Sequence, residues 1–296
     1  MSGTASSSPS NDATPLVIIH IDDLGASHGA NIAMTELAAA GVVTSGSVIV
    51  PAPWFPEIAR SNHPSLDLGV HLALTSESAA FRWRPVSTTS RASGLLDADG
   101  YLWPDTPSVR ANAHPDAVET ELRAQVEAAR AAGIDVTHLD HHMGAALAPE
   151  FAAATARLAK DYDLPVLFPR AIAGYVGVLK MGEVDVAILE TVRAELDADG
   201  LAIGEEFLMG LVYQDEPCRD VYERFFNQLQ PGVTFLSLHC SEPGEIEQIH
   251  PGDFARRVAE YDLFRDVEFT GWLARQRVRL IGFREIRDSL RTGQLY

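Results

Sequence analysis

The chain has 296 residues, 46% of them hydrophobic, which is enough for one large domain with a substantial core or for two small ones. Its 41 acidic and 23 basic side chains give a formal net charge of −18, which disfavours nucleic acid and anionic lipid as partners and suits a neutral or cationic ligand. Two cysteines cannot build a disulfide framework, and no apolar run approaches the roughly 20 residues of a membrane span. We therefore expect a soluble, cytoplasmic protein.

The first fifteen residues differ in composition from the rest of the chain. Residues 1–15 are rich in Ser, Thr, Ala, Asn and Pro, and they lack the basic start and apolar centre of a signal peptide. We expect this segment to be a disordered tail. Because residues 16–296 contain no repeat and no obvious linker, we expect them to form a single domain.

Short apolar segments alternate with helical stretches along that domain. The first predicted strand covers residues 16–21, and a predicted helix over residues 30–40 ends at Gly41, a residue suited to a helix C-cap. A longer helix is predicted over residues 116–132, with Gly133 as its stop. The remaining predicted strands are residues 42–50, 66–74, 135–139, 164–168, 207–212, 234–239 and 278–283.

Alternation of strands and helices indicates a parallel sheet with crossover helices. We predict an α/β fold of the irregular (β/α) barrel type, in which the functional loops follow the C-terminal ends of the strands. An open, doubly wound parallel sheet is the alternative, because hydrophobic periodicity does not distinguish the two.

Asp and His residues stand at the exits of four predicted strands. Asp22 and Asp23 follow the first strand, His71 lies near the end of another, residues 138–142 contain three histidines, and His239 ends a late strand. A lone histidine at a strand end is more often structural, but four such exits favour a shared site.

These residue types suit metal-assisted hydrolysis of an amide. Two imidazoles and a carboxylate can hold a divalent cation and leave positions for water and substrate. The cation would lower the pKa of water and polarise the carbonyl, a second carboxylate could take the proton of the water, and a histidine could give one to the leaving amine. The chain has no phosphate-binding glycine loop, and no GxSxG motif supports a serine nucleophile.

Several short segments share a pattern with a known family. They are His20-Ile-Asp-Asp-Leu-Gly25, Gly41-Val-Val-Thr-Ser45, Gly69-Val-His-Leu-Ala-Leu-Thr75, Leu96-Asp-Ala-Asp-Gly100 and Thr137-His-Leu-Asp-His-His142, with a weaker match at Ser237-Leu-His239. In this order they resemble the YdjC-like or ChbG-like carbohydrate deacetylases, which are distant relatives of the polysaccharide deacetylases. The family fold is an irregular α/β barrel.

The resemblance implies a role for each matching residue. It implies that Asp23, His71 and His142 hold the metal, that Asp22 is the general base, and that His239 assists the leaving amine or the oxyanion. The implied substrates are small N-acetylglucosamine-containing saccharides of the chitobiose type. The ligand types suit zinc, whereas family members are commonly described as magnesium-dependent, so the expected cofactor is a divalent cation, Mg²⁺ or Zn²⁺.

The chain departs from the family where His141 replaces a serine, which leaves His141 as an alternative ligand to His142. Four further residues are candidates for substrate binding. Trp83 and Arg84 lie in a long loop-like stretch where an aromatic face suits a sugar ring, although both could instead pack this loop onto the barrel. His138 could hold Asp140 or a substrate hydroxyl, and Arg170 could orient Asp22 through an ion pair.

Three classes of function stay open at this point. The first is a deacetylase acting on a small N-acetylated saccharide, with a homo-oligomer compatible with the sequence. The second is another metal-dependent barrel hydrolase, such as an amidohydrolase or a phosphoesterase, although a phosphate substrate calls for more Lys and Arg around the site. The third is a catalytically silent carbohydrate-binding relative, against which the intact Asp and His set argues.

Overall fold

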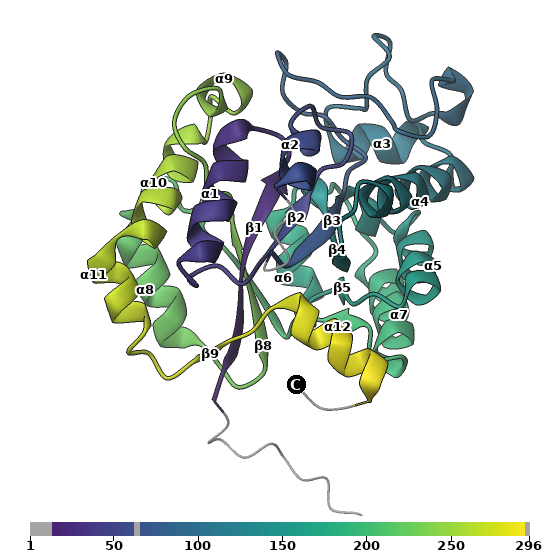
Figure 1. Ribbon diagram of the computed structural model, residues 1–296. Coiled ribbons are helices and arrows are strands. Elements are labelled where there is room, and N and C mark those ends of the chain that lie inside the picture. Colours follow the sequence, from purple (N-terminus) through teal and green to yellow (C-terminus); the bar gives the residue numbers. More distant parts are fainter. Residues whose placement is uncertain (1–13, 62–65, 294–296) are drawn as a thin grey trace, which may run out of the picture.

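The first strand, β1 (Leu16–Leu24), is buried along almost its whole length, as its aliphatic and β-branched residues predict. It pairs in parallel with β8 (Val233–Leu238) on one side, and on the other with β9 (Arg279–Leu280) and then β2 (Ser45–Val48). The computed structural model describes residues 14–61 and 66–293 (Figure 1). Of the expected disordered tail, residues 1–13 lie outside this described part.

The strands form one parallel sheet that curls into a barrel, which confirms the predicted fold. Their order is β6-β5-β4-β3-β2-β1-β8-β7, with β9 beside β1. The strands not yet introduced are β3 (Leu68–Leu72), β4 (Val136–His141), β5 (Val166–Leu167), β6 (Ala202–Ile203) and β7 (Glu206–Met209).

One extended segment closes this barrel. β6 pairs with β5, and β7, which follows after only Gly204 and Glu205, pairs with β8 at the opposite edge of the sheet. The same stretch of chain therefore serves both edges. β6 was not predicted, because two residues are too few to show a hydrophobic period.

Helices surround the strands (Figure 1). The two glycines expected to stop helices both follow helix ends: α1 (His28–Ala39) precedes Gly41 and α4 (Pro115–Ala131) precedes Gly133, each glycine with positive φ. The other α-helices are α2 (Phe55–Arg60), α3 (Thr106–Asn112), α5 (Ala152–Tyr162), α6 (Ile172–Val178), α7 (Val186–Ala198), α8 (Cys218–Gln228), α9 (Ile246–Ile249), α10 (Phe254–Arg265), α11 (Val267–Leu273) and α12 (Phe283–Thr292). Short 3₁₀ turns are η1 (Arg91–Ser93), η2 (His142–Leu147) and η3 (Gly210–Val212).

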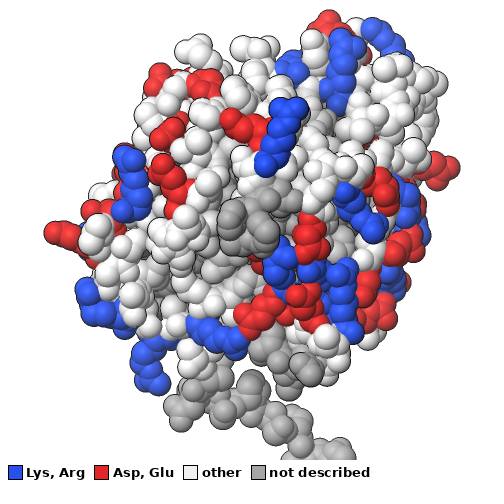
Figure 2. Space-filling view, viewed as in Figure 1, with Lys and Arg blue, Asp and Glu red and all other residues white. Residues whose placement is uncertain are grey.

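Many surface arginines are paired with nearby carboxylates, as where Arg284 and Arg287 of α12 both contact Asp135. On the face shown in Figure 2, basic side chains lie beside acidic ones. Within residues 14–61 and 66–293, no helix is both long enough and apolar enough to cross a bilayer.

Candidate metal and catalytic site

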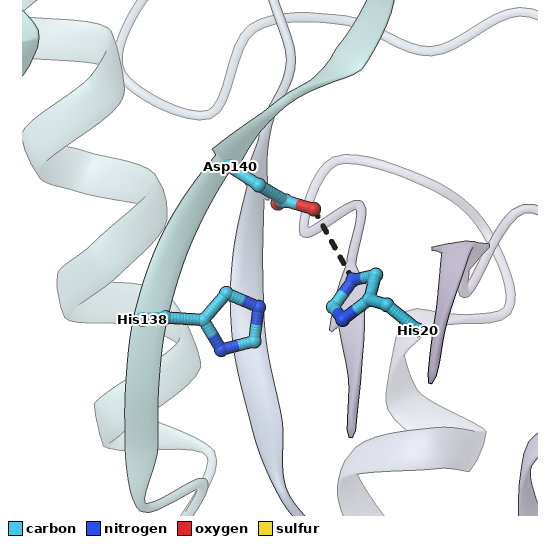
Figure 3. A group of neighbouring side chains, drawn as sticks. All are labelled: His20, His138 and Asp140. Atoms are coloured by element: carbon cyan, nitrogen blue, oxygen red, sulfur yellow. Dashed lines mark ion pairs between the residues drawn. The ribbon is translucent and has the colours of Figure 1, made fainter. Parts of the chain in front are cut away.

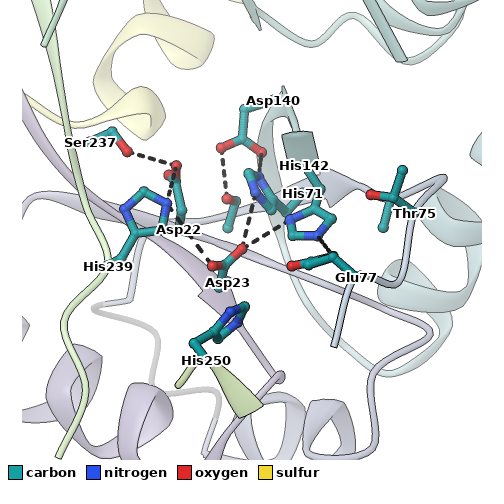
Figure 4. Close-up of polar contacts among 12 residues, drawn as sticks. Asp22, Asp23, His71, Thr75, Glu77, Asp140, His142, Ser237, His239 and His250 are labelled. Atoms are coloured by element: carbon teal, nitrogen blue, oxygen red, sulfur yellow. Dashed lines mark hydrogen bonds and ion pairs between the residues drawn. The ribbon is translucent and has the colours of Figure 1, made fainter. Parts of the chain in front are cut away.

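A cavity of about 560 Å³ opens at the C-terminal ends of the strands. Asp22 and Asp23 reach it from β1, His71 from β3, and His142 from the start of η2. His239 reaches it from the residue after β8. The parallel barrel thus gathers on one rim the residues that the strand exits suggested (Figure 4).

Asp23, His71 and His142 form a compact three-residue cluster. Asp23 Oδ1 lies 3.4 Å from His71 Nε2 and 3.1 Å from His142 Nδ1, and the ligand atoms of the three residues all lie within 4.8 Å of one another. Asp23 has φ of 62°, and the register of β1 against β2 shifts between Ile21 and Leu24. In this left-handed backbone, uncommon outside glycine, the carboxylate of Asp23 faces both imidazoles.

Each of the two imidazoles is held from behind by a carboxylate. His71 Nδ1 lies 2.8 Å from Asp140 Oδ1, and His142 Nε2 lies 2.9 Å from Glu77 Oε2. A carboxylate at the far nitrogen keeps the proton there, so the nitrogen facing Asp23 is free to bind a cation. The donor set therefore fits a divalent metal, because each rear carboxylate favours the tautomer that ligation requires.

The electrostatics of the cluster also suit a cation. Although burial opposes it, Asp140 and Asp23 raise the pKa of His71 well above its ordinary value. Burial likewise opposes the rise at His142, where Glu77 and Asp23 nevertheless raise the pKa to about 9. The carboxylates thus attract positive charge strongly, in protonated imidazoles or in a bound divalent ion.

The two adjacent aspartates differ in environment. Burial raises the pKa of Asp22 to about 6, and its Oδ2 accepts a hydrogen bond of 2.8 Å from Ser237. At Asp23 burial acts in the same direction, but the Arg257 guanidinium, with Nη1 2.8 Å from Oδ2, and the two imidazoles hold the pKa well below its ordinary value. Asp22 is thus the more basic carboxylate, and Asp23 is held as an anion.

His239 lies on the other side of Asp22. Its Nε2 is 3.7 Å from Asp22 Oδ2 and 4.0 Å from Asp23 Oδ2. Burial and the nearby Arg257 charge hold the pKa of His239 well below its ordinary value. The backbone N–H of His239 donates to Glu260 Oε2 at 2.7 Å, which fixes the turn after β8.

A second group of polar residues lies beneath this site (Figure 3). His20 Nε2 is 3.2 Å from Asp140 Oδ2 and 3.3 Å from Asp22 Oδ1, so it connects the carboxylate behind His71 to Asp22. Its Nδ1 lies 2.7 Å from Ser45 Oγ. His138, fully buried, stacks on Phe283 of α12 with ring centroids 3.8 Å apart.

The structure separates His141 from His142. His141 Nε2 lies 2.9 Å from the Leu167 carbonyl, so this nitrogen is directed at the neighbouring strand β5. Burial lowers the pKa of His141 to about 4. His142, one residue beyond the end of β4, is the histidine that joins the cluster.

The four residues expected to bind substrate stand outside the described cavity lining. Trp83 is buried and donates its ring N–H to the Thr75 carbonyl, packing the loop onto the barrel, and Arg84 lies over the Tyr101 ring. Arg170 Nε bonds Glu205 at 2.6 Å instead of reaching Asp22. His138 Nδ1 contacts Thr137 Oγ1, and its buried Nε2 has no hydrogen-bond partner among the described residues, Asp140 included.

Two residues of the site were missed in the sequence. Glu77 lies beyond the strand exit in an irregular segment, and Arg257 lies on α10, where a charged residue usually faces solvent. Arg257 is instead buried between Asp23 and Asp253. The Asp after Thr-His-Leu, Asp140, was part of a quoted motif, and its role behind His71 follows from β3 and β4 being neighbours.

Comparison with known proteins decides the family. The chain matches the YdjC-like protein family over residues 16–275, which is most of its length. The chain belongs to the YdjC-like family. Within this family, it is 34% identical over 253 residues to a carbohydrate deacetylase of Thermus thermophilus, covering 83% of this chain and 84% of that protein. A carbohydrate deacetylase of Listeria monocytogenes is 26% identical over 276 residues, covering 91% and 99%.

A solved structure agrees with the YdjC-like fold. A protein of Enterococcus faecalis, described as a proposed cellobiose-phosphate cleavage protein, superposes with a TM-score of 0.74 at 20% identity and covers 93% of this chain and 99% of its own. At this identity the likeness concerns the fold alone. The earlier resemblance to this family, drawn from short motifs, is confirmed.

Proposed function

We propose that this protein is a metal-dependent carbohydrate deacetylase that hydrolyses the acetamide of small N-acetylated amino sugars of the chito-oligosaccharide type. The observation that carries the proposal is the convergence of Asp23, His71 and His142, each imidazole being backed by a carboxylate, beside the more basic Asp22. The relatives named carbohydrate deacetylase support it.

In this proposal Asp23 Oδ1, His71 Nε2 and His142 Nδ1 hold Mg²⁺ or Zn²⁺. When bound, the cation polarises the amide carbonyl and lowers the pKa of water. Arg257 keeps Asp23 anionic, and Asp140 and Glu77 hold the proton of each neutral imidazole on the nitrogen that faces away from the cation.

Asp22 and His239 divide the proton transfers. Asp22 accepts the proton of the attacking water, since it lies beside the ligand Asp23 and its raised pKa makes it a better base than an ordinary carboxylate. His239 Nε2, 3.7 Å from that carboxylate, takes this proton over from Asp22 and delivers it to the leaving amine. Because the pKa of His239 is depressed, its protonated form is a stronger acid than an ordinary imidazolium.

The phosphoesterase alternative is less well supported. Lys180 and Arg257 are the basic Lys and Arg side chains among the described residues of the cavity lining, and Arg257 is already paired with Asp23 and Asp253. A phosphate group would find little free positive charge from the protein here.

Acetate release from N-acetylglucosamine and chitobiose, with and without a chelator, tests the proposal. Asp22→Asn should retain metal affinity but lower turnover by about 100-fold to 10,000-fold, the usual contribution of a general base. Asp23→Asn should weaken metal binding, and excess cation should restore part of its activity. Asp161→Asn, which alters a surface ion pair with Arg123, is the matched control. If added cation restores the activity of Asp22→Asn, while Asp23→Asn is inactive with its metal site fully occupied, then Asp23 is the base and Asp22 the metal ligand.

A further inference from the structure

The cavity has two halves of different chemistry. The half described above carries the Asp and His cluster on β1, β3, η2 and the turn after β8. The other half comes from the segment between β5 and η3. Its main side chains, here called the apolar wall, are Val178, Leu179, Phe207, Met209, Leu211 and Val212.

The apolar wall is open to the cavity. Val178, Leu179, Phe207, Met209 and Leu211 are only half-buried, and Val212 is 47% exposed. Apolar side chains that face a cavity gain stability when a ligand removes them from water, by about 25 cal/mol per Å² of surface covered. A wall of this kind beside reactive groups is typical of a site for an apolar part of a ligand.

A bare saccharide makes poor use of such a wall. Each pyranose ring carries several hydroxyls that need hydrogen-bond partners when they leave water. Among the described lining residues of this half, polar side-chain groups come from Tyr175, Lys180 and Gln214. Trp83, the tryptophan expected to stack on a sugar ring, is buried outside the cavity lining, and its Nε1 donates to the Thr75 carbonyl.

We propose that the substrate is amphipathic: an N-acyl amino sugar bearing an aliphatic group, which lies on the apolar wall while the amide reaches the Asp and His cluster. This inference rests on the proposed function and narrows its substrate class. The aliphatic group could enter on the sugar side, as an alkyl aglycone, or on the acyl side, as a longer N-acyl chain. Both present the same chemistry to the wall.

Three synthetic compounds separate these sources. They are the methyl and octyl β-glycosides of N-acetylglucosamine and the methyl β-glycoside of N-octanoylglucosamine, each used below its micelle concentration with the cation-loaded protein. Since burial of each methylene on the apolar wall is favourable, we expect either the octyl glycoside or the N-octanoyl compound to exceed the methyl glycoside of N-acetylglucosamine by at least about 10-fold in kcat/KM. Preference for the octyl glycoside places the chain on the sugar side, and preference for the N-octanoyl compound places it on the acyl side. Equal values for all three overturn the proposal.

A pair of matched variants tests the wall itself. Val212→Asn should lower the ratio of kcat/KM for the preferred long-chain compound to kcat/KM for the methyl glycoside of N-acetylglucosamine by about threefold to tenfold, since a polar amide replaces an apolar contact. Val86→Asn is the control, because Val86 is 43% exposed and stands outside the cavity lining. An unchanged ratio in Val212→Asn, with the same melting temperature as Val86→Asn, contradicts the assignment.

A binding measurement distinguishes failure of the deacetylase proposal from failure of the inference about the apolar wall. If none of the compounds is hydrolysed, calorimetric binding of the same three compounds still decides the inference. If either long-chain compound binds at least about 10-fold more tightly than the methyl glycoside of N-acetylglucosamine, an amphipathic ligand is supported. Equal affinities for the three compounds overturn the inference.

Discussion

The carboxylate of Glu77 gives a sensitive test of whether the site is built for a metal. Its Oε2 lies 2.9 Å from His142 Nε2, on the side of the ring away from Asp23. Glu77→Ala would leave that N–H without a partner and would also remove a negative charge from the cluster. Loss of such a carboxylate behind a ligating histidine typically costs about 10-fold to 100-fold in metal affinity, or roughly 1.4 to 2.7 kcal/mol.

The assay is calorimetric titration of the metal-free protein with Mg²⁺ and, in competition with a chelator, with Zn²⁺. Glu77→Gln is expected to lose less affinity than Glu77→Ala, because the amide oxygen can still accept the N–H of His142. Glu57→Ala provides the control: Glu57 Oε1 lies 2.8 Å from His28 Nδ1 in a more exposed pair outside the cluster. Equal metal affinity in wild type and Glu77→Ala, with unchanged melting temperature, would refute the assigned role of Glu77.

Two further predictions concern buried charges around the site. Arg257→Met should destabilise the metal-free protein by about 3–5 kcal/mol, because it leaves the Asp23 anion buried without its arginine partner. Added divalent cation should then raise the melting temperature of the variant more than that of wild type. Equal shifts in melting temperature would contradict this prediction. Burial raises the pKa of Glu260 from 4.5 to about 7, so the folded state holds this proton over a range in which the unfolded chain has lost it. Its contribution to the free energy of unfolding therefore falls by up to about 3 kcal/mol as pH rises through that range. Urea unfolding should therefore show that the free energy of unfolding of wild type, relative to that of Glu260→Gln, is lower at about pH 8 than at about pH 5. The same difference in free energy between the two proteins at both pH values would exclude a raised pKa at Glu260.

Much of the fold followed from the sequence because its signals are local. The alternation of apolar segments with helical stretches predicted the parallel barrel, and Gly41 and Gly133 stop helices as expected. Strand ends were less accurate: residues 42–50 were predicted, and β2 covers Ser45–Val48. Strand β6 was missed because its two residues, which pair with the neighbouring strand β5, are too few to show a hydrophobic period.

The site was predictable to the extent that strand exits carry it. Asp22, Asp23, His71 and His239 lie at or just beyond the C-terminal ends of strands in one parallel sheet, so their proximity needed only the parallel topology. The partners that tune them were not predictable in this way. Arg257 approaches Asp23 from a helix, 234 positions away in the chain, and no spacing in the sequence connects the two.

Arg170 shows the converse error. It follows β5 much as His239 follows β8, yet its guanidinium pairs with Glu205 and its side chain is 60% exposed. Position at a strand exit thus identifies a candidate, but the direction in which the side chain leaves the barrel decides its role.

The arrangement of the cavity along the chain has an evolutionary consequence. The apolar wall comes from one continuous stretch, from α6 to η3, whereas the Asp and His cluster is contributed by segments before and after it. Recombination or insertion within that stretch could therefore exchange one preference for the apolar part of a ligand for another while every residue of the Asp and His cluster stays in place. Grafting the corresponding stretch between YdjC-like barrels is accordingly a direct route to new specificities from a shared catalytic half.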